Sequence, residues 1–149
     1  MARPKRNFKP RQRLDADGNV IDPRTKMLEE WTPKTELGRK VKAGEITTIE
    51  EVMNSGKKIL ESEIVDAVIP NLESDFINVG QAKGKFGGGQ RRIFKQTQKK
   101  TKDGNRISFN ALAVVGNRDG YVGVGIGRSK ETVPAKDKAI RNAKLNIMQ

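Results

Sequence analysis

The chain has 149 residues, of which 30 are Lys or Arg and 18 are Asp or Glu, so its net charge at pH 7 is +12. It contains neither cysteine nor histidine, which excludes disulfides, thiolate metal sites and every catalytic triad that uses histidine. It also lacks a run of eighteen apolar residues and an apolar signal-peptide core, so no membrane partner is expected. These features favour a cytoplasmic, non-catalytic protein with a polyanionic partner, nucleic acid above all.

The charge is distributed unevenly along the chain. Residues 1–13 carry six basic and no acidic side chains, whereas residues 14–80 carry eight basic and fourteen acidic ones. Residues 81–106 carry nine basic side chains and one acidic, and residues 107–149 carry seven and three. A polyanion is therefore expected to contact the two strongly basic segments rather than the acidic one.

The first thirteen residues include two prolines and almost nothing apolar, so they cannot fold alone. We expect this basic tail to order on a phosphate backbone, with a solvated, floppy tail as the alternative. Asp15 to Asp22 is interpreted as a turn-rich linker, because its glycine and Lys26 do not match the positions that an EF-hand calcium loop requires. The basic side chains of the tail are Arg3, Lys5, Arg6, Lys9, Arg11 and Arg13.

Three short helices are predicted between residues 34 and 70. Thr35 caps the first, and Gly44 stops it. A capping box at residues 48–51 begins the second, and the third covers about residues 61–69. The carboxylates of this segment show no regular metal-ligand spacing and would repel phosphate, so we expect them to face protein or solvent.

Residues 81–106 combine dense positive charge with interleaved phenylalanines and a Gly-Gly-Gly run. Residues 91–101 are predicted to form a strand, and residues 102–105 a turn into the next strand. A protruding basic loop suits insertion between phosphates, because each Lys or Arg contact releases a condensed counterion. Charge that serves solubility alone is the weaker alternative. The expected backbone contacts are Lys95, Lys99, Lys100, Lys102 and Arg106, with Arg91, Arg92, Arg128 and Lys130 flanking them.

The clearest pattern is a hairpin over residues 107–129, whose central break, residues 116–120, contains an Asp-Gly pair that tolerates positive φ. Gly123, Gly125 and Gly127 leave one face of the second strand without side chains, which marks the close approach of another backbone. A helix laid on this face is the main interpretation, and a nucleic-acid backbone is the alternative. The glycine spacing does not match the dinucleotide-binding fingerprint.

The last helix is predicted from Thr132 to about Ile147, with Pro134 in its first turn. Its apolar stripe contains Ala139 and Ala143, and these small side chains suit close packing on the glycine-bare strand. With the strand at residues 91–101, these elements give three antiparallel strands backed by a helix.

Several runs of residues have a family counterpart. They are W-T-P-K-T-E-L-G-R-K-V from Trp31, E-S-E-I-V-D from Glu61, K-Q-T-Q from Lys95, the long run from Asn105 to Glu131, and A-I-R-N-A-K-L-N-I from Ala139. Together, over roughly residues 31–149, the chain resembles the N-terminal part of the small-subunit ribosomal protein S5 family in its archaeal and eukaryotic form.

The resemblance implies an α+β fold. We expect a double-stranded-RNA-binding-like domain over residues 80–149, with a three-stranded antiparallel sheet backed by helix. A helical, acidic N-terminal extension over residues 34–79 and a basic, extended tail and linker over residues 1–33 precede it. The family continues into a second α/β domain, which is expected to be missing from this chain.

The resemblance also implies a function: a structural constituent of the small ribosomal subunit that binds small-subunit rRNA near the messenger RNA entry path. Such a protein contacts neighbouring ribosomal proteins and supports subunit assembly, translation and decoding accuracy. The family's RNA-facing hairpin loop corresponds to Lys102, Asp103, Gly104, Asn105 and Arg106.

Two other classes of function are weighed against this one. A free-standing double-stranded-RNA-binding module, acting as a regulator or chaperone, would read RNA shape and 2′-hydroxyls across the minor groove. An enzyme acting on a phosphorylated substrate is disfavoured, because the sequence lacks histidine, cysteine and a phosphate-cradling fingerprint. No cofactor and no metal are expected.

Overall fold

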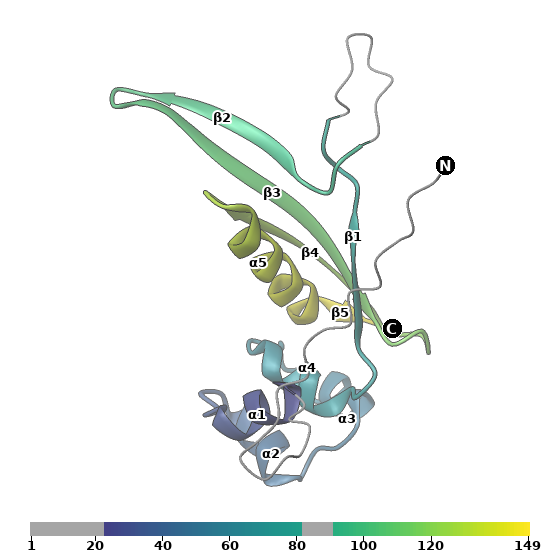
Figure 1. Cartoon of the computed structure of the whole chain (residues 1–149). Helices are drawn as coiled ribbons and strands as arrows, with labels where there is room; N and C mark the ends of the chain where they lie inside the picture. Colours follow the sequence, from purple (N-terminus) through teal and green to yellow (C-terminus); the bar gives the residue numbers. More distant parts are fainter. Residues whose placement is uncertain (1–22, 82–90) are drawn as a thin grey trace, which may run out of the picture. The chain divides into compact units, whose positions relative to one another are not determined.

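The computed structural model describes residues 23–81 and 91–149, and the chain divides into two compact units, residues 1–32 and 33–149. The first unit contains helix α1 (Pro23–Glu30), and the remaining elements belong to the second (Figure 1). The sequence predicted an extended tail and linker over residues 1–33, and this is wrong for residues 23–30, which form α1. Pro23 occupies the first helical position, where its missing N–H costs nothing, and Met27 and Leu28 are good helix formers.

The three helices predicted between residues 34 and 70 are confirmed as α2 (Glu36–Ala43), α3 (Ile49–Asn54) and α4 (Ser62–Val68). The Thr35 hydroxyl accepts a hydrogen bond from the Gly38 N–H at 3.1 Å and so caps α2. Gly44 ends α2 with a φ of +79°, a left-handed conformation that glycine adopts without steric cost. Local sequence signals therefore determine where α2 begins and ends.

The capping box of α3 gives a direct test of this local control. Thr48 Oγ1 accepts from the Glu51 N–H at 3.4 Å, and Glu51 Oε2 accepts from the Thr48 N–H at 3.4 Å. We expect Thr48→Ala to lower the free energy of unfolding by about 1 kcal/mol in urea titrations. Thr47→Ala is the control, because Thr47 supplies its backbone N–H to the same carboxylate and alanine retains that group. Identical unfolding midpoints for the two variants would contradict this assignment.

Two acidic side chains of the helical segment form ion pairs within the chain. Lys144 of α5 (Thr132–Leu145) places its Nζ 2.7 and 2.6 Å from the two carboxylate oxygens of Asp66, which ties α4 to α5. A hydrogen bond of 2.7 Å from the Lys57 ammonium holds the pKa of the Glu36 carboxyl below its ordinary value. Beneath these polar contacts lies an apolar core made of Leu37, Val41, Ile49, Val52, Ile59, Ile64, Val65 and Ile69.

Within the described residues the antiparallel sheet has five strands: β1 (Glu73–Ile77), β2 (Lys95–Thr101), β3 (Gly104–Gly116), β4 (Val122–Ser129) and β5 (Ile147–Met148). The order is β1-β3-β4-β5, and β2 pairs with β3 on the same edge as β1. The three predicted strands are present as β2, β3 and β4, and β1 and β5 enlarge the sheet. The segment at residues 91–94 lies outside β2, which is therefore shorter than predicted.

Both additional strands depend on distant partners. β1 has the sequence E-S-D-F-I, which lacks apolar alternation, and it forms by pairing with residues 112–116 of β3. Helix α5 ends at Leu145 rather than Ile147, because Ile147 pairs with Gly123 in β5 and is buried there. Because β1 precedes residue 80, the sheet draws on the segment assigned to the helical extension, and a domain boundary at residue 80 stays a prediction.

Helix α5 covers the glycine-bare face of β4 (Figure 1). A Cβ atom added at Gly123 would meet the Ala143 carbonyl oxygen, and one added at Gly127 would meet the Ala135 carbonyl oxygen. The helix interpretation is therefore confirmed, and the alternative of nucleic-acid backbone on this face is wrong. The adjoining core consists of Ala111, Ala113, Val115, Ala139 and Ala143.

Candidate nucleic-acid interface

The β2–β3 hairpin extends beyond the rest of the sheet as a two-stranded projection (Figure 1). Among the described strands, residues 104–108 of β3 pair with β2 alone, because β4 pairs with residues 109–116 and β1 with residues 112–116. Lys102 and Asp103 form the turn at the tip, and Gly104 follows with a φ of +110°. We call residues 95–108 the basic arm.

The register sorts the basic side chains of the arm by face. Directly paired residues of an antiparallel sheet project to the same side, and Ala113, opposite Phe76, lies on the side covered by α5. Even-numbered residues of β3 therefore project from the other side, which we call the open face. Some of the predicted RNA-binding cations project from the open face. They are Arg106 of β3 and three cations that pair with even-numbered residues of β3, Lys95, Lys99 and Arg128.

Arg128 is held in place by neutral groups. Its Nε and Nη2 donate to Ser108 Oγ at 3.2 and 3.0 Å, and Ser108 Oγ lies 2.8 Å from Thr97 Oγ1. By contrast, the guanidinium of Arg118 forms an ion pair of 2.7 Å with Glu73. Because hydroxyls orient the Arg128 guanidinium without neutralising it, its full charge is available to an anion.

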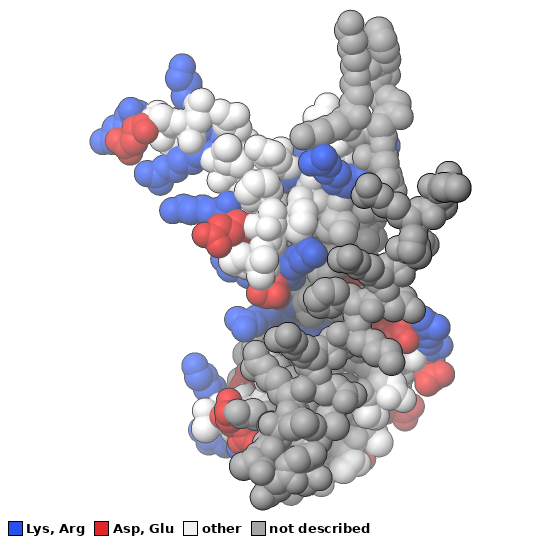
Figure 2. Space-filling view, in the orientation of Figure 1, with Lys and Arg blue, Asp and Glu red and all other residues white. Residues whose placement is uncertain are grey.

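The remaining predicted residues lie around the arm. Lys100 pairs with Asn105 and projects from the side opposite Lys99, so both sides of the arm carry positive charge. Arg106 lies 3.5 Å from Asp103, a loose, exposed contact of small energetic value. Several Lys and Arg side chains gather on the projection that β2 and β3 form (Figure 2). The other predicted residues in the described part are Arg91 and Arg92 before β2, Lys102 and Gly104 at the tip, and Lys130 after β4.

The predicted contacts of the basic tail, from Arg3 to Arg13, lie outside the described residues. The same holds for the turn-rich linker from Asp15 to Asp22 and for the Gly-Gly-Gly run. Within residues 23–81 and 91–149, no three acidic side chains gather as metal ligands would. In that same part of the chain, no helix is both long and apolar enough to span a bilayer.

Sequence reasoning did not identify the residues that position the arm. Ser108 and Thr97 are ordinary strand residues until the three-strand register places them beside Arg128. At the base of the arm, Phe94 packs edge to face on Phe109 with ring centroids 6.5 Å apart. Lys136 of α5 lies 5.4 Å from the centroid of the same Phe94 ring. Phe94, which was predicted to lie in the strand at residues 91–101, directly precedes β2 and packs at the base of the arm.

The sequence is similar to known proteins. Residues 93–149 match the family model described as "Ribosomal protein S5, N-terminal domain". The chain is 47% identical over 122 residues to the small ribosomal subunit protein uS5 of Nanoarchaeum equitans, covering 82% of this chain and 52% of the relative. It is 47% identical over 123 residues to that of Picrophilus torridus and 46% identical over 123 residues to that of Thermoplasma acidophilum, covering 83% of this chain and 49% of each relative. The chain thus spans about half the length of the curated relatives it matches.

Proposed function

Because this chain belongs to the ribosomal protein S5 family, we propose that it is a structural constituent of the small ribosomal subunit and binds small-subunit rRNA through the basic arm and the basic tail. The relatives that carry the name small ribosomal subunit protein uS5 support the assignment to the subunit. The main support for RNA binding is the basic arm, a two-stranded projection with exposed cations on both sides and at its tip.

The arm suits the phosphate backbone of folded RNA. Its cations are spaced along two strands, so several phosphates can be neutralised at once, and each contact releases counterions. Backbone contacts of this kind fix position and orientation rather than sequence. The residues proposed for these contacts are Lys95, Lys99, Lys100, Lys102, Gly104 and Arg106, flanked by Arg91, Arg92, Arg128 and Lys130, with the tail residues in addition.

The family resemblance supports a finer proposal. The chain would lie near the messenger entry path of cytoplasmic ribosomes and contribute to subunit assembly and decoding accuracy. It would turn its acidic helices toward neighbouring ribosomal proteins or solvent rather than toward rRNA. No catalytic step, metal or cofactor is part of this function.

The neutral anchor of Arg128 yields a prediction about RNA affinity. Ser108→Ala removes the oxygen that accepts from Arg128 Nε and Nη2, so the guanidinium loses its fixed orientation. We expect about five-fold weaker binding to an rRNA fragment, equivalent to about 1 kcal/mol, in a filter-binding titration. In an Arg128→Ala background the same change should have no further effect, and an additive loss would contradict the positioning role.

Co-sedimentation tests the proposal as a whole. The full chain is mixed with small subunits depleted of their own S5-family protein and centrifuged through a sucrose cushion at moderate salt. A subunit constituent sediments at one copy per particle and resists competition by excess unrelated double-stranded RNA. A free-standing double-stranded-RNA-binding module would stay in the supernatant or be displaced by that competitor, and either result would overturn the proposal.

A further inference from the structure

The edge of β3 that carries the basic arm is paired in two separate stretches. β2 pairs with residues 104–110 of β3 and β1 with residues 112–116, so neither of these strands pairs with Ala111. β1 and β2 thus follow one another along the same edge, and each pairs with β3 rather than with the other. Hinges form at element ends of this kind, because a few residues there absorb the change in backbone angles. The basic arm therefore joins the rest of the sheet at a potential hinge.

One cation of α5 lies across this interruption. Phe76 of β1 pairs with Ala113, and Phe94 directly precedes β2, so the two rings come from opposite sides of it. Lys136 Nζ lies 5.2 Å from the centroid of the Phe76 ring and 5.4 Å from the centroid of the Phe94 ring. Both distances are in the range of a cation–π contact. A single ammonium thus connects the neighbouring ends of two strands to the helix.

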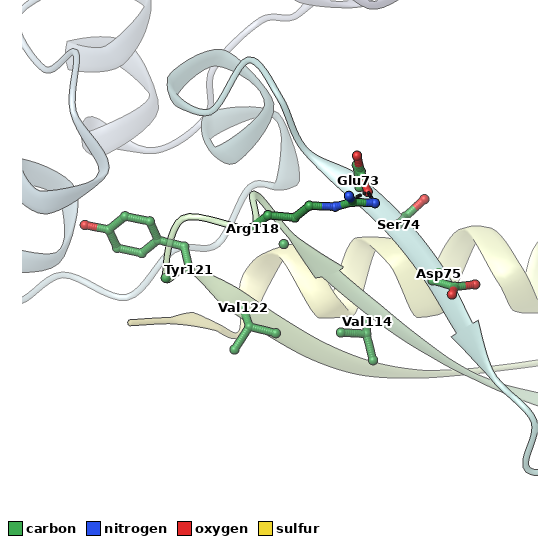
Figure 3. Close-up of a pocket in the computed structure, with 9 residues that line it drawn as sticks. Glu73, Ser74, Asp75, Val114, Arg118, Tyr121 and Val122 are labelled. Carbon is green, nitrogen blue, oxygen red and sulfur yellow. Dashed lines mark hydrogen bonds and ion pairs between the residues drawn. The ribbon is translucent and has the colours of Figure 1, made fainter.

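On the side of the body, Phe76 belongs to a strand that is held firmly. Its ring packs against the core that contains Ala113 and Ala139. At the start of β1, Arg118 reaches from the β3–β4 turn to Glu73, with Nε 2.9 Å from its Oε2 (Figure 3). β1 is therefore fixed near both of its ends, and Phe76 offers Lys136 a fixed point.

On the side of the arm, Phe94 controls where β2 begins. Lys95, the next residue, is the first of β2, and the Phe94 ring packs edge to face on Phe109. The Gly80 N–H donates to the Arg92 carbonyl oxygen at 2.6 Å and so closes the chain just before Phe94. Because Phe94 adjoins the arm directly, a movement of Phe94 away from α5 would change the direction of the arm.

The burial of Lys136 distinguishes it from other cations of α5. Its side chain is half-buried, whereas Lys138 and Arg141 are exposed. A cation–π contact is stronger when the ammonium is partly desolvated. A contact with phosphate would require the ammonium to leave both rings, so the position of Lys136 favours a role within the chain.

We propose that Lys136 is a positioning residue: it fixes the direction of the basic arm by holding Phe94 beside Phe76, and it does not contact phosphate. RNA affinity then depends on Lys136 through the arm, because an arm already held in its bound direction loses less conformational freedom on binding. This inference rests on the proposed function, in which the basic arm contacts rRNA.

Distance measurements on the free protein test the positioning role without RNA. Because the chain contains no cysteine, Asp103→Cys at the tip and Arg141→Cys on α5 provide two specific sites for spin labels. Pulsed electron paramagnetic resonance then gives the distribution of distances between them. We expect Lys136→Met to broaden this distribution and Lys136→Arg to restore it, because a guanidinium also stacks on aromatic rings.

The matched control is Lys138→Met, which removes the same charge from the exposed part of the helix. It should leave the distribution unchanged. Equal widths for Lys136→Met and this control would overturn the inference. Cooperative melting of each variant by circular dichroism ensures that a broad distribution reports the arm rather than unfolding.

RNA titrations separate positioning from a phosphate contact. In the full chain without labels, Lys136→Met should weaken binding to an rRNA fragment about five-fold and leave the slope of log K against log salt unchanged. A fall of about 0.7–0.9 in that slope would mean that Lys136 contacts a phosphate, and it would overturn the inference. An affinity that Lys136→Arg failed to restore would overturn it as well. If the unaltered chain did not bind rRNA, the proposed function would be contradicted instead, and the distance distributions would still decide whether Lys136 fixes the arm.

Discussion

Gly125→Val is expected to lower the free energy of unfolding by about 3 kcal/mol or more, the upper end of the range for overpacking a core. A Cβ at position 125 would meet the Ala143 amide nitrogen, and it would lie 2.5 Å from the Ala139 carbonyl oxygen and 2.6 Å from the Asn142 carbonyl carbon. All three are backbone atoms, so no change of rotamer relieves the clash, and α5 must move away from the sheet. Thermal unfolding should show a drop of the order of 10 °C.

The matched control for this prediction is Val124→Ile on the same strand. Residue 124 projects from the open face, where it is 44% exposed, so an added methylene meets no backbone there. Its effect should stay within about 0.5 kcal/mol, as for most surface substitutions. If Gly125→Val and Val124→Ile had the same melting temperature, close packing of α5 on the glycines would not be what holds the sheet and helix together.

Neutralising the basic arm is expected to have the largest effect on binding. With six to ten phosphate contacts, the affinity of the unaltered chain for an rRNA fragment should fall roughly 10³–10⁵-fold between 50 and 200 mM salt. Each contact removed should reduce the slope of log K against log salt by about 0.7–0.9. Replacing five cations by glutamine should therefore lower the slope by about 4. The residues replaced are Lys95, Lys99, Lys100, Lys102 and Arg106.

A variant with the same change in net charge provides the control. Five exposed cations of the helical segment are replaced by glutamine: Lys34, Arg39, Lys40, Lys57 and Lys58. This segment is acidic overall and is expected to face away from RNA, so the slope should stay close to that of the unaltered chain. Equal loss of slope in both variants would mean that net charge alone, rather than the arm, governs binding.

Local signals predicted most of the fold. Capping residues Thr35 and Thr48 specify helix starts, and the three glycines of β4 predict the helix that covers them. The elements that sequence reasoning missed depend on distant partners. β1 has no pattern of its own and forms because β3 is long enough to pair with it beside β2. In the β3–β4 turn, Arg118 as well as Gly120 adopts positive φ, because Asn117 Oδ1 accepts the Asp119 and Tyr121 N–H groups and fixes the loop.

The same distinction between local signals and distant partners applies to the candidate nucleic-acid interface. Charge density and turn residues predicted which cations the arm carries, since both are local properties of residues 91–106. The strand register determines which cations project from the same face. The structure was therefore needed to group Lys99 with Arg106 and Lys95 with Arg128. The contact of Ser108 with Arg128 also required the structure, because it is assembled from three strands, β2, β3 and β4.

A density map of the small subunit that contains this chain tests the central claim most directly. We expect residues 95–106 to lie against sugar–phosphate backbone. The Lys99 and Arg106 side chains on one side of the arm and the Lys100 side chain on the other should all lie within reach of phosphates. A map in which the arm is surrounded by solvent or buried in protein, with no RNA beside it, would contradict the account.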